Sequence, residues 1–411
     1  MIRLYVIYMK IRVGVLYGGK TTEHEVSIIT AVQAMGYLNP EKYEVVPIYL
    51  TKENEIYTGA PLKEMEVYKD YDLLKRYCKN VVCYNKNGVL LLQNKNGLLK
   101  RTIAEVDIVI PCVHGFNMED GNIQGLLEIY GIPYTGSDIY GCTVGQDKVF
   151  QKQILEAEGI PVTKYVWFYE SEYLEDEEKY IKQAEKIGYP LIVKPARQGS
   201  SIGIKIAKDK ESLKEAIIEA INYDEKILIE EVINNMTELN CSVLGSNSYM
   251  QTSSIEQVMG KDEFLSFNDK YIGTGAKKGN SKLKVSGPSK GMVSADRVIP
   301  ANIPDKLAND ISQTSKKVFR ALGASGVVRI DYLYDKKSKK YYVNELNTIP
   351  GSLSFYLWTP LNKEYDELLD DMINIAVKRF KKNLKKTTIF ESNILEGFNG
   401  SKGVKGKIKN R

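Results

Sequence analysis

Zinc-type ligands are scarce in this chain. Its 411 residues include two histidines, His24 and His114, and five cysteines, no two of which stand in a C-x-x-C spacing. A structural zinc site needs a set of closely spaced Cys or His ligands, so the sequence argues against one. An odd number of thiols without such spacing is typical of reduced cysteines, and we therefore expect a cytoplasmic protein.

A long apolar run and a large excess of one charge are also absent. The apolar start of the chain is interrupted by Arg3, Lys10 and Arg12, and no small-residue cleavage site follows it. It is too short for a membrane span or a secretory signal, and we interpret Met9 as the natural start, with residues 1–8 upstream of it. The net charge is only +5, and the lysines are scattered except near the end. We therefore expect neither a nucleic acid nor a membrane as a partner.

The residues that are present predict an α/β protein. A β-branched run at 11–17 ends in two glycines, an amphipathic helix follows at 21–38, and a second apolar run covers 42–50. This order is typical of a parallel sheet covered by helices. Residues 51–105 are polar, and we expect them to be irregular, with hairpin-like Lys-Asn-Gly turns at 86–88 and 95–97. The pattern also predicts a buried strand at 107–115 and a helix at 122–136.

The length suggests two or three domains, and changes in the pattern place their boundaries. We expect an N-terminal substrate domain at 1–137, a central lobe at 138–229, a C-terminal lobe at 230–385 and a disordered basic tail at 386–411. In the two lobes the sequence predicts helices at 146–161, 177–188, 305–322 and 363–382, and strands within 190–207, 226–233, 238–245 and 327–347.

The most informative segment is the hairpin at 327–347. Alternation along its first strand places Arg329 and Asp331 on one face, and alternation along the second does the same for Glu345 and Asn347. A turn centred on Ser338 sets Asp331 opposite Glu345. Two facing carboxylates repel each other, whereas a bound cation reverses the sign, and oxygen ligands of this kind suit Mg²⁺. A solvated charged hairpin is the alternative, but it leaves acids among apolar residues unexplained.

Three further segments carry candidate chemistry. Lys194 ends a strand and enters the Gly/Ser loop 197–203, whose amides and hydroxyls suit a phosphate, although a plain hairpin turn fits equally well. Lys148 begins a helix and offers a second positive charge, unless it is simply exposed. Glu25 and His114 each follow the end of a strand, where open α/β sheets bind ligands, but Glu25 also fits a helix-dipole role.

These segments occur in the order and approximate spacing of the D-alanine–D-alanine ligases, members of the ATP-grasp superfamily. The chain resembles that family over roughly residues 10–382, through the stretches GGKTTEHEVS, HGFNMEDGNIQG, GIPYTGS, QDK, KPARQGSSIGI, LIEEVI, NDKY, RID and NELNTIPG. The resemblance implies three α/β domains with ATP held between the central and C-terminal ones. It also implies ATP-dependent joining of two D-alanines through an acyl phosphate, for peptidoglycan precursors, with a homodimer as one option.

The resemblance also implies roles for individual residues. Glu25 holds the ammonium of the first D-alanine, His114 lies near its carboxylate, and Ser200 belongs to a closing loop. Arg329 and the Gly351 amide stabilise the oxyanion. Nucleotide contacts are implied for Lys148, Lys194, Glu230, Glu231, Ile233, Glu238 and Lys270, and metal contacts to two Mg²⁺ ions, which Mn²⁺ is able to replace, for Asp331, Glu345 and Asn347.

The identity of the second amino acid depends on residues that depart from the family pattern. Family members usually carry small hydroxyl residues after the Pro-Gly pair, where this chain has Phe355 and Tyr356, so Ser354 and Tyr356 become the candidate contacts. Tyr271 matches a mobile loop and the residue of family members that accept an amine. We expect D-alanine to be preferred over D-serine. A D-alanine–D-serine ligase, another carboxylate–amine ligase of the superfamily, and a nucleotide-binding regulator without catalysis are the alternatives.

Overall fold

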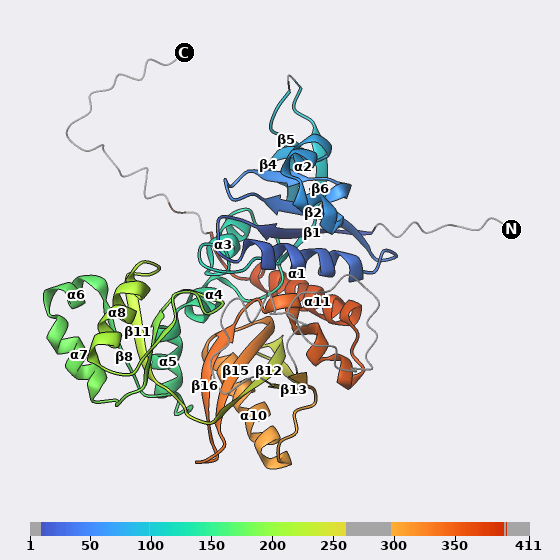
Figure 1. Cartoon of the computed structure of the whole chain (residues 1–411). Coiled ribbons are helices and arrows are strands. Elements are labelled where there is room, and N and C mark those ends of the chain that lie inside the picture. Colours follow the sequence, from blue (N-terminus) through green and yellow to red (C-terminus); the bar gives the residue numbers. More distant parts are fainter. Residues whose placement is uncertain (1–9, 98, 260–296, 390–391, 393–411) are drawn as a thin grey trace.

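The computed structural model describes residues 10–97, 99–259, 297–389 and 392. Their strands form three sheets with helices packed against them, so the predicted α/β class is confirmed (Figure 1). The expected start at Met9, the long loop after residue 259 and nearly all of the basic tail lie outside the described residues.

The first sheet, at the top of Figure 1, has the strand order β6-β5-β4-β3-β2-β1-β7. Its β2, β1 and β7 are parallel, as the βαβ pattern predicts, and the other pairs are antiparallel. The strands are β1 Ile11–Gly18, β2 Tyr43–Leu50, β3 Ile56–Thr58, β4 Lys79–Lys86, β5 Val89–Asn94, β6 Thr102–Val106 and β7 Ile108–Pro111. The helices of this unit are α1 His24–Tyr37, η1 Ala60–Lys63, η2 Met65–Lys69, α2 Tyr71–Tyr77 and α3 Asn122–Ile129. The next helix, α4 Ile139–Gln146, contacts α3, α5 and β16.

The expectation of irregular structure at 51–105 is wrong, although the hairpin-like turn expected at 86–88 is confirmed between β4 and β5. This region supplies β3 to β6 and extends the parallel core on one side. Its strands alternate weakly because β4 has several exposed positions, and such strands resemble polar loops in sequence. Antiparallel pairing across the turn at Asn87 and Gly88 decides their structure.

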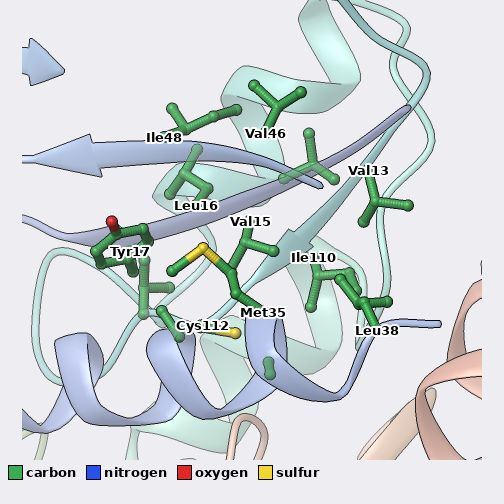
Figure 2. Packing of buried hydrophobic residues seen from close by; sticks show 14 of the residues in the cluster. Val13, Val15, Leu16, Tyr17, Met35, Leu38, Val46, Ile48, Ile110 and Cys112 are labelled. Carbon is green, nitrogen blue, oxygen red and sulfur yellow. The ribbon is translucent and has the colours of Figure 1, made fainter. Parts of the chain in front are cut away.

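A continuous hydrophobic core joins β1 to α1, the helix at the bottom of Figure 2. Val13 and Val15 of β1 are fully buried, and Met35 and Leu38 pack against the same cluster. The cluster also includes Tyr365 and Leu368 of the closing helix α11, Tyr365–Asn383. The C-terminal helix therefore ties the first sheet to the last one.

The second sheet has the order β10-β9-β11-β8, with β8 Tyr165–Tyr169, β9 Leu191–Pro195, β10 Lys205–Ala207 and β11 Lys226–Glu231. Its helices are α5 Lys148–Ala157, α6 Glu170–Glu175, α7 Glu177–Glu185 and α8 Lys210–Ile221. The two runs predicted within 190–207 are confirmed as the antiparallel pair β9 and β10. A domain boundary between residues 229 and 230 would fall inside β11, so the division into domains stays a prediction.

The third sheet has the order β14-β13-β12-β15-β16. Its strands are β12 Met236–Ser246, β13 Tyr249–Val258, β14 Arg297–Val298, β15 Gly326–Asp335 and β16 Lys340–Asn347. It is accompanied by α10 Asp305–Ala321, η4 Gly351–Leu357, η5 Thr359–Leu361 and α11. None of the described helices is both long and apolar enough to cross a bilayer.

Candidate active site

Two adjoining cavities lie where the three sheets meet. The first is lined from the N-terminal unit by Glu23 and His114, from the β9–β10 loop by Ser200, and from the third sheet by many polar side chains. The second lies between Lys148 and Lys194 on one side and β15 and β16 on the other. Gly199, Ser200, Glu238 and Glu345 line both cavities, so a ligand in one adjoins a ligand in the other.

The carboxylate that reaches the first cavity is Glu23, and the role expected for Glu25 is corrected accordingly. Glu23 is 6% exposed and lines the cavity. The Glu25 side chain is 68% exposed and pairs with Lys52. Glu23 is the N-cap residue of α1 and has a non-helical backbone, whereas Glu25 lies in the first turn of the helix, so the two side chains leave the chain in different directions. The motif with two glutamates therefore presents its first one to the site.

Glu23 closes against the Gly/Ser loop. The Ser200 hydroxyl donates a hydrogen bond to Glu23 Oε1. A Cβ at Gly199 would meet Glu23 Oε2 at 2.5 Å, so a side chain at this position would push the carboxylate away from the loop. Burial and the nearby charge of Glu119 raise the pKa of Glu23, although His114 and Ser200 act in the opposite direction. A buried carboxylate with a raised pKa suits a site that receives a positive charge.

His114 lies in the same cavity, as the sequence predicts, and its side chain is held from behind. Its Nε2 is 2.9 Å from the Thr30 hydroxyl, and its Nδ1 is 3.7 Å from Glu119 Oε2. The Thr30 hydroxyl also accepts a hydrogen bond from the Ser352 amide at 3.1 Å. Thr30 of α1 thereby links the imidazole to the turn that begins at Gly351.

The hairpin sets Asp331 opposite Glu345, as predicted, but by a different route. At the turn, Asp335 pairs with Lys340, a register that would set Asp331 opposite Asn344. A β-bulge between Asp331 and Tyr332 shifts the pairing by one residue. The bulge therefore brings the two carboxylates together, in keeping with the occurrence of bulges beside active sites.

Asp331 is buried in a cluster of donors and acids. Arg329 Nε and Nη2 donate to its two oxygens at 2.6 Å and 2.7 Å, and Asn347 Nδ2 donates at 3.0 Å. Burial raises the pKa of Asp331, Arg329 lowers it, and Glu345 and Glu238 raise it again, with a net upward shift. Within the described ranges no three His, Cys, Asp or Glu side chains converge as a metal site. Two carboxylates and an amide nevertheless form an oxygen donor set that fits Mg²⁺.

The two lysines predicted to contact phosphates lie together in the second cavity. Lys148 Nζ donates to the Gln198 carbonyl at 2.6 Å and is 3.3 Å from Glu345 Oε2. Lys194 Nζ is 2.8 Å from Glu230 Oε2. The helix that begins at Lys148 is capped by Asp147, whose carboxylate accepts from the Val149 and Phe150 amides.

The remaining candidates for nucleotide contact are distributed unevenly. Glu230 is buried with its lysines, and Glu238 lines both cavities from β12. Glu231 accepts a hydrogen bond from the Lys164 amide, and Ile233 follows β11 in a half-buried position. Neither Glu231 nor Ile233 lines the two cavities. Lys270 and Tyr271 lie outside the described residues.

The turn after Pro350 has an unusual backbone. Ser352, Leu353 and Ser354 all have left-handed conformations, with φ of 52°, 50° and 52°. Each costs about 1–2 kcal/mol for a residue with a side chain, and such strain collects at functional sites. Gly351 and Tyr356 of this turn line the first cavity.

Only one of the two aromatic residues in that turn faces the cavity. Phe355 stacks on Tyr365 of α11 with ring centroids 4.4 Å apart and does not line the cavity. The hydroxyls of Ser354 and Tyr356 have no hydrogen-bond partner among the residues that the structure describes. Ser354 is buried but does not line the cavity.

Sequence reasoning missed an arginine and its partner. Arg297 of β14 lines the first cavity, pairs with Glu256 Oε1 at 2.7 Å, and lies 5.0 Å from the centroid of the Tyr356 ring. Asn240 Nδ2 donates to the other oxygen of Glu256 at 3.0 Å. Arg297 is far from every recognised motif, so only the pairing of β13 with β14 reveals it.

Comparison with known proteins identifies relatives along nearly the whole chain. Family models described as "D-ala D-ala ligase N-terminus" and "D-ala D-ala ligase C-terminus" match residues 12–137 and 154–374. A D-alanine–D-alanine ligase from Thermosipho melanesiensis is 39% identical over 94% of this chain and 98% of its own length. One from Thermosipho africanus is 38% identical with the same coverage.

Solved structures agree with these matches. The D-alanine–D-alanine ligase from Coxiella burnetii has a TM-score of 0.74 at 24% identity, covering 92% of this chain and 96% of its own, which shows the fold. The VanG D-Ala:D-Ser ligase from Enterococcus faecalis has a TM-score of 0.72 at 28% identity, covering 90% of this chain and 100% of its own. The Bacillus anthracis D-alanine–D-alanine ligase complexed with ATP has a TM-score of 0.62 at 25% identity, covering 91% and 99%.

The fold is thus that of an ATP-grasp enzyme, with the cavities at the junction of its units. Two family models together span most of the chain, and the relative from Thermosipho melanesiensis matches 94% of it. This chain belongs to the D-alanine–D-alanine ligase family.

Proposed function

We propose that this protein joins two D-alanines into D-alanyl-D-alanine, with conversion of ATP to ADP and phosphate, as a supply of peptidoglycan precursor. The observation that carries the proposal is the pair of adjoining cavities. One has lysines and a carboxylate hairpin, which suit a metal-bound triphosphate, and the other has a buried glutamate and two arginines, which suit amino acids. The shared wall is where the two reactants meet.

The nucleotide belongs in the second cavity. Lys148 and Lys194 provide positive charge for the phosphates, and the Ser200–Ser201 loop covers them. Glu231, Ile233 and Glu238 follow along β11 and β12 and are proposed for the adenosine part, whereas Glu230 would act through Lys194, with which it pairs. Lys270, outside the described residues, stays a proposed nucleotide contact. Positioning and charge supply most of the catalysis of phosphoryl transfer.

Asp331, Glu345 and Asn347 are the residues that would hold Mg²⁺. The metal, when bound, neutralises phosphate charge in the reaction. Its presence would also balance two carboxylates that face each other across the hairpin. Arg329 is held by Asp331 in a bidentate pair at the edge of the first cavity.

The first D-alanine would place its ammonium on Glu23 and its carboxylate beside His114. The carboxylate oxygen attacks the terminal phosphorus of ATP, which releases ADP and forms an acyl phosphate. The amine of the second amino acid then attacks the carbonyl carbon, phosphate leaves, and the amine loses its proton. Arg329 and the Gly351 amide are placed to stabilise the oxyanion of that step. Exclusion of water by the Ser200 loop protects the reactive intermediate.

The second amino acid would lie against Tyr356 and Arg297. The guanidinium of Arg297 is positioned to receive its carboxylate, and the Tyr356 hydroxyl is a polar atom buried without a partner in the described chain. Ser354, whose buried hydroxyl also lacks a partner among the described residues, stays a proposed contact. We propose D-alanine as the preferred second substrate, because the bulky phenol of Tyr356 leaves room only for a small side chain.

The test is ATP-dependent phosphate release across a panel of D-amino and hydroxy acids, with mass identification of the product. D-Alanine should give the highest kcat/KM and D-alanyl-D-alanine as product, with modest rejection of D-serine and no depsipeptide from D-lactate near neutral pH. A clear preference for D-serine would make the chain a D-alanine–D-serine ligase. Nucleotide binding without turnover of any pair would contradict the enzymatic proposal altogether.

A further inference from the structure

A buried carboxylate behind the nucleotide cavity is shared by two lysines. Glu230 Oε1 is 2.6 Å from Lys152 Nζ, and Glu230 Oε2 is 2.8 Å from Lys194 Nζ. The three side chains are 2%, 2% and 5% exposed. The Thr163 hydroxyl accepts from Lys152 at 2.9 Å and donates to Glu230 at 2.6 Å, which fixes the arrangement.

The charges of this triad do not cancel. One carboxylate and two ammonium groups sum to +1, although one lysine would suffice to neutralise Glu230. Burial of a second cation is costly, and burial lowers the pKa of Lys152. The two lysines also differ in position. Lys194 lines the nucleotide cavity together with Lys148, whereas Lys152 does not line it.

This asymmetry suggests a use for the extra charge. If Lys194 were the only partner of Glu230, every shift of its ammonium toward a phosphate would leave a buried carboxylate unpaired, at a cost of several kcal/mol. Lys152, which approaches the other carboxylate oxygen from α5, keeps Glu230 paired during such a shift.

We propose that Lys152 is a positioning residue for the nucleotide, which neutralises Glu230 from behind so that Lys194 presents its charge to the phosphates. This inference rests on the proposed function, because it takes ATP as the occupant of the cavity. The competing explanation is purely structural: Lys152 would only join α5 to β11. The two differ in whether the effect depends on the phosphates of the ligand.

The experiment compares the full-length chain with Lys152→Met, Lys152→Arg and, as a matched control, the exposed Lys164→Met. Dissociation constants for adenosine, ADP and ATP are measured directly by calorimetry. K152M should weaken ADP and ATP by about tenfold or more while adenosine changes less than about threefold. K152R and K164M should bind all three nearly as the wild type does. Equal weakening of adenosine and ATP, or no weakening, overturns the inference.

A second variant covers the case in which K152M alone does not fold. In K152M/E230Q the buried carboxylate is removed together with its partner, so Lys194 is no longer drawn away from the phosphates. The ratio of the adenosine and ATP dissociation constants should return toward that of the wild type, and a ratio that stays low contradicts the inference. If the wild-type chain itself does not bind ATP, the proposed function fails, whereas normal wild-type binding with an unaffected variant defeats only the role of Lys152.

Discussion

Three buried carboxyl groups of this protein have pKa values that are shifted in opposite directions. Burial raises the pKa of Glu230, but the two lysines beside it bring the pKa well below its ordinary value. Burial is the largest influence on the pKa of Asp331; together with the smaller effect of the neighbouring acids it exceeds the lowering by Arg329, so the pKa stays raised. Glu23 resembles Asp331, with a pKa raised by burial and by Glu119.

This difference in pKa distinguishes a carboxylate with a structural environment, Glu230, from two carboxyls that are proposed to bind ligands, Asp331 and Glu23. The protein's own lysines complete the environment of Glu230, so that carboxylate is stable without a ligand. The carboxyls of Asp331 and Glu23 are short of positive charge, and each is the group for which a cationic ligand is proposed: Mg²⁺ for Asp331 and an ammonium for Glu23. Perturbed carboxyls of this second kind are frequent at functional sites.

The largest effect is expected from Glu345→Gln, which removes one of the two carboxylates that face each other on the hairpin. Loss of a metal ligand should lower kcat by about a thousandfold while the melting temperature stays close to that of the wild type. Phosphate release at increasing Mg²⁺ concentrations measures the effect. The same change at Glu215, an exposed residue of α8, is the control. Near-normal turnover in E345Q would remove the metal from this hairpin.

A smaller effect is expected from Glu23→Gln, and comparison with Glu25→Gln shows which of the two glutamates binds the substrate. The E23Q change removes the buried charge for the substrate ammonium and should lower kcat/KM for D-alanine by about a hundredfold. The E25Q change removes only an exposed ion pair with Lys52, which is worth less than about 1 kcal/mol, and should alter kcat/KM less than about twofold. Initial rates at varied D-alanine distinguish the two, and the reverse ranking would return the role to Glu25.

A third test concerns Arg297, which compensates Glu256 at the edge of the first cavity. In Arg297→Met, Glu256 would confront the carboxylate of the second amino acid, and the KM for that substrate should rise about tenfold or more. The double variant R297M/E256Q removes the repelling charge and should recover part of the loss. Kinetics at saturating ATP measure both. An unchanged KM in R297M would place the second carboxylate elsewhere.

The smallest effect is expected at Glu230, the carboxylate that is paired with two lysines. The folded-state pKa of Glu230 is lowered, so its ionic contribution to stability is complete above the unfolded-state value of about 4.5 and is lost as the pH falls below it. The stability difference between wild type and Glu230→Gln should shrink by about 1 kcal/mol between pH 4.5 and 3.5. Denaturant unfolding at the two values measures it. A difference that does not change with pH would show that the lysines do not hold Glu230 ionised.

The sequence predicted most of the regular elements, because strong local patterns mark them. The run of β-branched residues at 11–17 became β1, and the hairpin at 327–347 became β15 and β16. The antiparallel strands within 51–105 were missed because their exposed faces are polar and their apolar faces short. Their pairing is a long-range property that no local period reports.

The sequence by itself determined the family resemblance, through the spacing of its motifs. It also determined that Asp331, Glu345 and Asn347 lie on one face of the hairpin, because side chains alternate between the two faces along a strand. Tertiary structure decided which glutamate at the start of α1 enters the cavity, because that choice depends on what the N-terminus of the helix packs against. The β-bulge in the hairpin and the arrival of Arg297 at Tyr356 were decided in the same way. Both depend on pairing between strands, and that pairing is specified by contacts between residues far apart in the chain rather than by their local order.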